Sequence, residues 1–241
     1  GTGAADSALA NLALAVSTCP SAAVAPFALS WEGRLLAAGQ RYQEAAAAYR
    51  RLIAEYPQSD LIDQAWRDLG LVHKQDGDLA AALDAFGHVG RQSPSWPKVQ
   101  AEVGDLLLAE RRIDELVTRF DITGGIEQAL AAGDDETASE LYYVSGRIAR
   151  ERGEAAMEIE HLSRALELGQ NPQLISFCLF FRGLAYYRLG SAEGAAGQAA
   201  ARFAACADDL SAVLERNPTA DMRSAADRTR GVAVTRLGRS S

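Results

Sequence analysis

Apolar residues recur along the chain at the spacing of amphipathic helices. Trp66, Leu69 and Gly70 fall on one helical face, Gly77 interrupts that helix, and apolar residues then return at 3.6-residue spacing until Pro94. This pattern predicts two antiparallel helices joined by a short turn. A glycine inside a helix costs about 1 kcal/mol relative to alanine. We therefore expect Gly70 to lie where the second helix comes too close for a side chain.

The same spacing resembles the tetratricopeptide repeat (TPR). That repeat places a large residue, Leu-Gly, an aromatic residue, Gly, a small residue, an aromatic residue and Pro at fixed offsets. The matching residues are Trp66, Leu69, Gly70, Gly77, Ala82, Phe86 and Pro94, with His73 in place of the first aromatic residue. A solenoid requires several such units, because one helix pair cannot bury its apolar face alone.

Further copies of the close-packing glycine are present on both sides of this unit. Gly33 lies 37 residues before Gly70, Gly104 lies 34 residues after it, and Gly146 and Gly183 are themselves 37 residues apart. Phe120 follows Gly104 at the distance that separates Phe86 from Gly70. The chain thus contains five copies of the pattern.

The turn inside each helix pair is expected to contain a glycine. Gly153 and Gly190 fit this position in the fourth and fifth copies, and Gly39 is one residue out of phase in the first. In the third copy Arg111 and Arg112 stand where the glycine would be. That copy is therefore the most degenerate of the five.

These patterns predict an all-α fold, a TPR-like superhelical solenoid of about five helix pairs with flanking cap helices. Residues 1–24 form an N-terminal helix or cap, residues 25–218 the repeats, and residues 219–241 a C-terminal capping helix. Within the repeats we expect irregular geometry over 121–134, with a short helix bracketed by Gly124-Gly125 and Gly133. The second helix of the fifth pair, at 191–217, carries about 11 extra residues, close to three turns. We expect that helix to protrude from the solenoid.

Composition narrows the range of functions. The net charge of −8 favours solubility and argues against nonspecific binding to nucleic acid or anionic membranes. The sequence contains no run of 18 apolar residues, which a membrane-spanning helix would need. The three cysteines, Cys19, Cys178 and Cys206, show neither CxxC nor Cys/His metal spacing, so buried free thiols are expected.

No residues assemble into a catalytic or metal-binding motif. His73 occupies a packing position of the repeat, and His161 is not part of an HExxH sequence. Gly190, Gly194 and Gly197 lack the Gly-Lys-Ser/Thr ending of a phosphate-binding loop. We therefore predict no enzymatic activity, no metal and no cofactor.

The TPR resemblance implies a binding groove lined by the first helix of each pair. The expected groove residues are Trp31, Arg34, Arg67, Lys74, Tyr143, Arg147, Arg150, Phe180, Tyr187 and Arg188. Phe177 and Phe181 are close in helical phase to Cys178, so both core and groove positions stay open for them. Arginines beside aromatic rings suit carboxylates and apolar anchors. The expected ligand is an internal acidic and aromatic peptide or helix.

Two functional hypotheses follow from this surface. The first is a non-enzymatic scaffold that binds a partner protein or peptide in the groove. The alternative is a structural or regulatory subunit of a larger complex, with contacts made by the long fifth-repeat helix and the end caps; self-association and association with other chains both fit it. The turn from Tyr56 to Asp60 also resembles repeats in bacterial cell-envelope TPR proteins of the Tol–Pal-associated type. That resemblance points to the periplasm or envelope and leaves the cytoplasm open.

Overall fold

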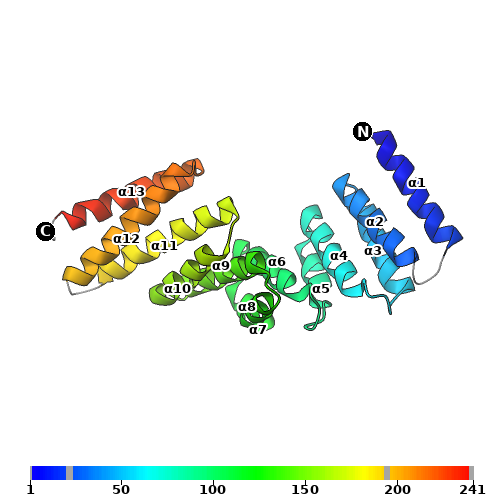
Figure 1. The fold of residues 1–241 in the computed structure, drawn as a ribbon, viewed down its shortest axis with the longest axis horizontal. Coiled ribbons are helices and arrows are strands. Elements are labelled where there is room, and N and C mark those ends of the chain that lie inside the picture. The colour runs from blue at the N-terminus through cyan, green and yellow to red at the C-terminus, as the bar shows by residue number, and fades with distance from the viewer. Residues whose placement is uncertain (1, 20–23, 193–195, 239–241) are drawn as a thin grey trace. The chain divides into compact units, whose positions relative to one another are not determined.

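The protein is described by a computed structural model over residues 2–19, 24–192 and 196–238. This part of the chain forms thirteen α-helices and no strands (Figure 1). The predicted all-α repeat architecture is therefore confirmed. The helices divide into two compact units, Gly1–Val99 and Gln100–Ser241.

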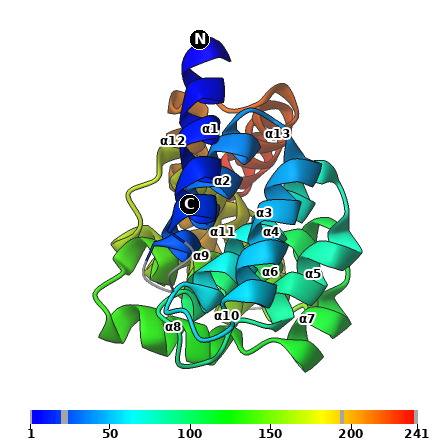
Figure 2. The same cartoon turned by 90° about the vertical axis from the view of Figure 1, so that its right-hand side faces the viewer.

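The first unit is a stack of helices in which α1 to α5 each pack on the next in sequence. Its helices are α1 (Thr2–Thr18), α2 (Ala25–Ala38), α3 (Tyr42–Glu55), α4 (Ile62–Asp76), α5 (Leu79–Gly87) and the start of α6 (Trp96–Ala109). Figures 1 and 2 both show α1 beside α2, on which it packs. Leu29, Tyr49 and Leu52 are fully buried at the centre of this core.

The second unit continues the same arrangement. It contains the rest of α6, followed by α7 (Ile113–Arg119), α8 (Ile122–Ala131), α9 (Asp135–Glu151), α10 (Ala155–Leu168), α11 (Pro172–Ala192), α12 (Ala196–Glu215) and α13 (Ala220–Leu237). Successive helices from α8 to α13 pack on one another. None of the helices in the described ranges is long and apolar enough to cross a membrane.

In four helix pairs a glycine of the first helix faces a large side chain of the second. A β-carbon on the glycine would lie less than 3 Å from that side chain. The pairs are Gly33 with Tyr49 (2.6 Å), Gly70 with Phe86 (2.5 Å), Gly146 with Leu162 (2.9 Å) and Gly183 with Leu210 (2.9 Å). The expectation for Gly70 is confirmed, and the repeat places the same contact in the other pairs.

The third pair departs from this rule. A β-carbon on Gly104 would lie 2.7 Å from Val144 of α9, so the close contact is made with a later helix and not with Phe120. The reason is that α7 has only seven residues and ends at Arg119, which leaves Phe120 in extended backbone. The segment 121–134 contains the expected short helix, the ten-residue α8, which already includes Gly124 and Gly125.

Arg111 explains how the third pair turns without its repeat glycine. Its backbone adopts the left-handed conformation with φ 57°, as Gln40 does at φ 59° in the first pair. Gly77 takes the corresponding conformation in the second pair, at φ 84°. The turn therefore needs a residue with left-handed backbone conformation at this position. In the first and third pairs that residue is Gln40 or Arg111 instead of glycine.

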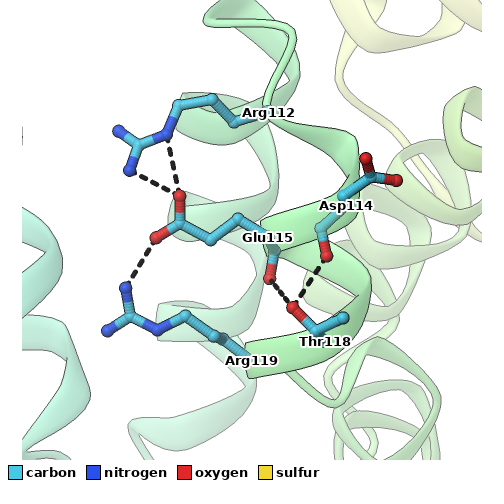
Figure 3. Close-up of polar contacts among 5 residues, drawn as sticks. All are labelled: Arg112, Asp114, Glu115, Thr118 and Arg119. Carbon is cyan, nitrogen blue, oxygen red and sulfur yellow. Dashed lines mark hydrogen bonds and ion pairs between the residues drawn. The ribbon is translucent and has the colours of Figure 1, made fainter.

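Helix α7 is held together by its own polar side chains (Figure 3). Arg112 Nε donates a hydrogen bond of 2.8 Å to Glu115, and Arg119 Nη1 donates one of 2.6 Å to the other carboxylate oxygen. Thr118 Oγ1 donates to the carbonyl oxygen of Asp114 at 2.8 Å. Contacts at this spacing support helices that are too short to be stable alone.

The extra residues of the fifth pair are shared between two helices. The glycine and its facing residue are 16 positions apart in Gly146 and Leu162 but 27 apart in Gly183 and Leu210, a difference of 11. Helix α11 continues through Gly190 to Ala192, so the chain does not turn at Gly190 as expected. Residues 193–195, which include Gly194, lie outside the described ranges.

The expectation of a protruding helix is wrong for the described residues. Helix α12 packs on both α11 and α13. Phe203 of α12 is buried, its ring lies 5.8 Å from that of Tyr187, and the Arg236 guanidinium lies 5.3 Å from it. The C-terminal part of α11 packs on α12, since a β-carbon on Gly190 would lie 2.9 Å from the Arg202 side chain.

Candidate functional site

The expected groove residues fall into two sets, one in each unit. Trp31, Arg34, Arg67 and Lys74 lie on α2 and α4 of the first unit, and the remaining six lie on α9 and α11 of the second. Each set is therefore described within its own unit.

In the first unit, the two arginines share one buried carboxylate. Arg34 Nε lies 3.5 Å from Asp68 Oδ2, and Arg67 Nη1 lies 3.7 Å from Asp68 Oδ1. Trp31 is 58% exposed, with the Arg34 guanidinium 5.6 Å from its ring centre. Lys74 is half-buried in the last turn of α4. The accessible part of this set is therefore the Trp31 ring together with the Arg34 side chain, which is 45% exposed.

Arg147 is the central cation of the second set. Its Nη1 donates a hydrogen bond of 2.8 Å to the Tyr143 hydroxyl, and its guanidinium lies 4.2 Å from the Phe181 ring centre. Among the described residues, no carboxylate forms an ion pair with Arg147, and its Nε is buried without a hydrogen-bond partner. Ring faces attract cations but leave their hydrogen-bonding capacity unused. Arg147 can therefore still bind an anion.

Arg150 and Arg188 both contact one carboxylate that is fully buried. Glu158 of α10 has no exposed surface; Arg188 Nη2 donates a hydrogen bond to its Oε2, and Arg150 Nη1 lies 3.5 Å from its Oε1. Burial raises the pKa of Glu158 although both arginines oppose that shift. Burial, followed by the charge of Arg188, lowers the pKa of Arg150. Both arginines therefore compensate the charge of a buried carboxylate. They also add positive charge beside Arg147.

The aromatic residues of α11 separate into two groups. Phe177 and Phe181 lie 6.3 Å and 6.2 Å from the Tyr143 ring, so both belong with Arg147. Phe180 and Tyr187 pack instead against the core formed by α12 and α13. The sequence placed Phe180 and Tyr187 in the groove and left Phe177 and Phe181 open, because helical phase alone does not show which neighbour covers each ring.

A pocket of about 270 Å³ opens beside Tyr143. It is lined by Asp105, Glu140, Tyr143, Asn171, Gln173, Leu174 and Phe177. Burial, together with the nearby charges of Asp105 and Glu102, raises the pKa of Glu140 to about 7. This pocket could not be predicted from the sequence, since its lining comes from α6, α9 and the start of α11 and no single element shows it.

The histidines and cysteines have structural environments. The buried His73 places Nε2 3.0 Å from Arg50 Nη2, and burial followed by the Arg50 charge lowers the pKa of His73. Burial raises the thiol pKa of Cys178 and Cys206 to about 12. Cys19 is exposed, so the expectation of buried thiols is wrong at that position, where α1 has ended. No group of three or more potential metal ligands occurs in the described ranges.

Comparison with known proteins shows similarity in fold to solved structures, without a match in sequence. No protein-family model and no curated protein sequence matches the chain. Among solved structures, BtubC (BKLC) from P. vanneervenii is similar over 95% of this chain and 89% of its own, with 13% identity and a TM-score of 0.65. A tetratricopeptide repeat protein from Parabacteroides merdae ATCC 43184 is similar over 97% and 93%, with 10% identity and a TM-score of 0.56. The chain is therefore a helical-repeat protein with a TPR-like fold.

Proposed function

We propose that the protein is a non-catalytic scaffold that binds a segment of a partner protein on the α9–α11 face, defined by Tyr143, Arg147, Phe177 and Phe181. The observation that carries this proposal is Arg147, a cation that lies on an aromatic ring and has no carboxylate partner among the described residues. Arginine and aromatic side chains dominate the binding energy of many protein interfaces. Helical repeats use extended surfaces of this kind to hold partners.

The chemistry of this face favours an acidic and aromatic segment. A carboxylate can accept charge-assisted hydrogen bonds from Arg147, and an apolar or aromatic side chain can pack on Phe177 and Phe181. Arg150 and Arg188 add to the positive potential, but their contacts with Glu158 limit direct binding. Arg147 is therefore the residue on which anion recognition depends.

The proposal is tested by affinity capture from extracts of the organism that encodes the chain. We expect the protein to retain a defined partner, and Arg147→Glu to lose it, because the substitution replaces the unpaired cation with an anion. Arg164→Glu is the matched control, since Arg164 lies on α10, is exposed and pairs with the exposed Glu167 at 2.8 Å. A partner that Arg147→Glu retains at both low and high salt would show that recognition occurs elsewhere.

A role as a subunit of a larger complex is the second candidate. It is favoured by apolar side chains that are exposed outside the α9–α11 face, namely Phe27 and Trp31 on α2 and Val232 and Val234 on α13. Phe27 and Trp31 are four residues apart and so share one helical face. Location in a bacterial cell envelope is also part of this proposal and depends on the Tyr56–Asp60 turn. Cell fractionation with an antibody would test that location directly.

A further inference from the structure

We propose that the pocket formed by Asp105, Glu140, Tyr143 and Phe177 binds a lysine or arginine side chain of the partner segment. The inference deepens the proposed function and depends on it for the identity of the ligand as a protein segment. It adds a cation-binding position beside the anion-binding Arg147. The partner is then expected to carry a basic and an acidic residue a few positions apart in its sequence.

The pocket combines the two groups that hold a cation. Carboxylates from α6 and α9 line it together with the rings of Tyr143 and Phe177, whose centres are 6.3 Å apart. A cationic head can pair with a carboxylate while its position over a ring adds a cation–π attraction. At about 270 Å³ the pocket is smaller than typical small-molecule sites of roughly 300–1,000 Å³. Its size therefore suits one side chain.

The electrostatic environment of Glu140 favours a positive ligand. Its carboxylate is surrounded by Asp105 and Glu102 on α6 and by Glu136 and Asp134 on its own helix. Burial and these negative charges all raise the pKa of Glu140, to about 7. Within the described chain, Glu140 has no ion pair. A cation that entered the pocket would relieve this repulsion.

The start of α11 does not supply a competing positive group. Pro172 has no backbone N–H, and the next two backbone N–H groups, of Gln173 and Leu174, both donate to Asn171 Oδ1, at 2.9 Å and 3.3 Å. These donors are therefore already satisfied by the capping side chain. The N-terminal N–H groups of α11 therefore do not offset the negative charge of Glu140.

The spacing along α9 defines the ligand further. Glu140, Tyr143 and Arg147 lie at positions i, i+3 and i+7 and so share one face of the helix. At 1.5 Å rise per residue, Glu140 and Arg147 are about 10 Å apart along the axis. An extended segment spans that length in about three residues. We therefore expect a basic and an acidic residue about three positions apart in the partner.

The pocket can be tested without knowing the partner. The probe is N-acetyl-lysine methylamide, titrated into the full chain while NMR signals of Tyr143, Phe177 and the Glu140 carboxyl group are followed. N-acetyl-norleucine methylamide is the matched probe, because it has the same aliphatic stem without the charge. We expect the lysine probe to shift these signals and the norleucine probe to leave them unchanged.

Variants and pH identify the groups responsible. Glu140→Gln should weaken binding of the lysine probe at least fivefold, and Asp105→Asn should weaken it too, whereas Glu167→Gln on the exposed part of α10 should leave it unchanged. Binding to the wild type should strengthen as pH rises from 6 to 8, because Glu140 loses its proton near pH 7. The pH dependence should be reduced in Glu140→Gln. Melting temperatures verify that both pocket variants remain folded.

Two results would overturn the inference. One is an equal response to the lysine and norleucine probes, and the other is undiminished lysine binding by folded Glu140→Gln and Asp105→Asn. If either occurs while Arg147→Glu still loses the captured partner, the pocket assignment fails and the proposed function stands. If the lysine probe binds selectively but Arg147→Glu retains the partner, the pocket stands and anion recognition by Arg147 fails.

Discussion

Gly70 determines whether the second helix pair can close. A β-carbon at this position would lie 2.5 Å from the Phe86 ring, which is 2% exposed and cannot move into solvent. Gly70→Leu must therefore displace a buried ring or separate α4 from α5. Overpacking of this kind typically costs about 1–3 kcal/mol. We expect a fall of several degrees in the melting temperature, measured by circular dichroism.

Gly231 provides the control for this prediction. It lies inside α13, and apart from the backbone of its own helix no other part of the described chain lies within 4 Å of the position of an added β-carbon. Gly231→Ala should leave the melting temperature unchanged or raise it, because alanine favours a helix by up to about 1 kcal/mol over glycine. If Gly70→Leu melted like the wild type, the close contact between α4 and α5 would be disproved.

At the residue scale, the sequence predicted where glycine is required for packing better than where it is required for turns. A helix-interior glycine is costly, so its recurrence at the packing position indicated a close contact. At the first turn, Gly39 has an ordinary φ of −83° and Gln40 adopts the left-handed conformation. Arg111 does the same in the third turn. A non-glycine residue can adopt the left-handed backbone conformation at modest cost, so glycine spacing alone does not locate the turn.

At the element scale, Arg147 and Arg150 lie on the same helix but are expected to respond differently to substitution. Arg150 lies 3.5 Å from the fully buried Glu158, so Arg150→Glu would place a second carboxylate beside it. Loss of one partner of a buried ion pair typically costs about 3–5 kcal/mol. Arg147→Glu removes no ion pair among the described residues and should cost much less. Chemical denaturation of the two variants measures this difference.

Both arginines were expected to line the groove, and Glu158 is what distinguishes them. Arg150→Gln with Glu158→Gln is the matched double variant, because it removes both charges and should recover part of the stability that Arg150→Glu loses. Equal stability of Arg147→Glu and Arg150→Glu would show that Glu158 does not depend on Arg150. The sequence could not separate the two arginines, since Glu158 belongs to a different helix.

The fifth pair shows what helical periodicity can and cannot predict. An insertion of 11 residues preserves helical phase, so the packing of Gly183 on Leu210 was still recognisable. Periodicity does not determine where the chain turns within such an insertion. Gly190 packs against the Arg202 side chain inside a continuing helix, although its spacing suggested a turn. The lengthening is therefore divided between α11 and α12.

At the scale of the whole molecule, the sequence predicted the number of helix pairs and missed the division into two units. Each pair is recognisable because its contacts are local and recur at a fixed period. The third copy is where this fails, since α7 is short, α8 is inserted after it and Gly104 packs on α9. The carboxylate pocket was missed for the same reason, because α6 and α9 meet there across those intervening helices.

The division into units predicts how a local defect spreads. Within each unit the described helices pack chiefly on their neighbours in sequence, and in repeat proteins stability is approximately a sum of such neighbouring terms. Gly70→Leu should therefore accelerate amide hydrogen exchange in α3, α4 and α5 and leave the protection of α11 to α13 unchanged. Phe203→Ala, which removes a buried ring at a typical cost of about 3–5 kcal/mol, should do the reverse. Hydrogen exchange measured by mass spectrometry under native conditions resolves both sets of helices in one experiment. Uniform acceleration across the chain in either variant would show that the two units unfold as one.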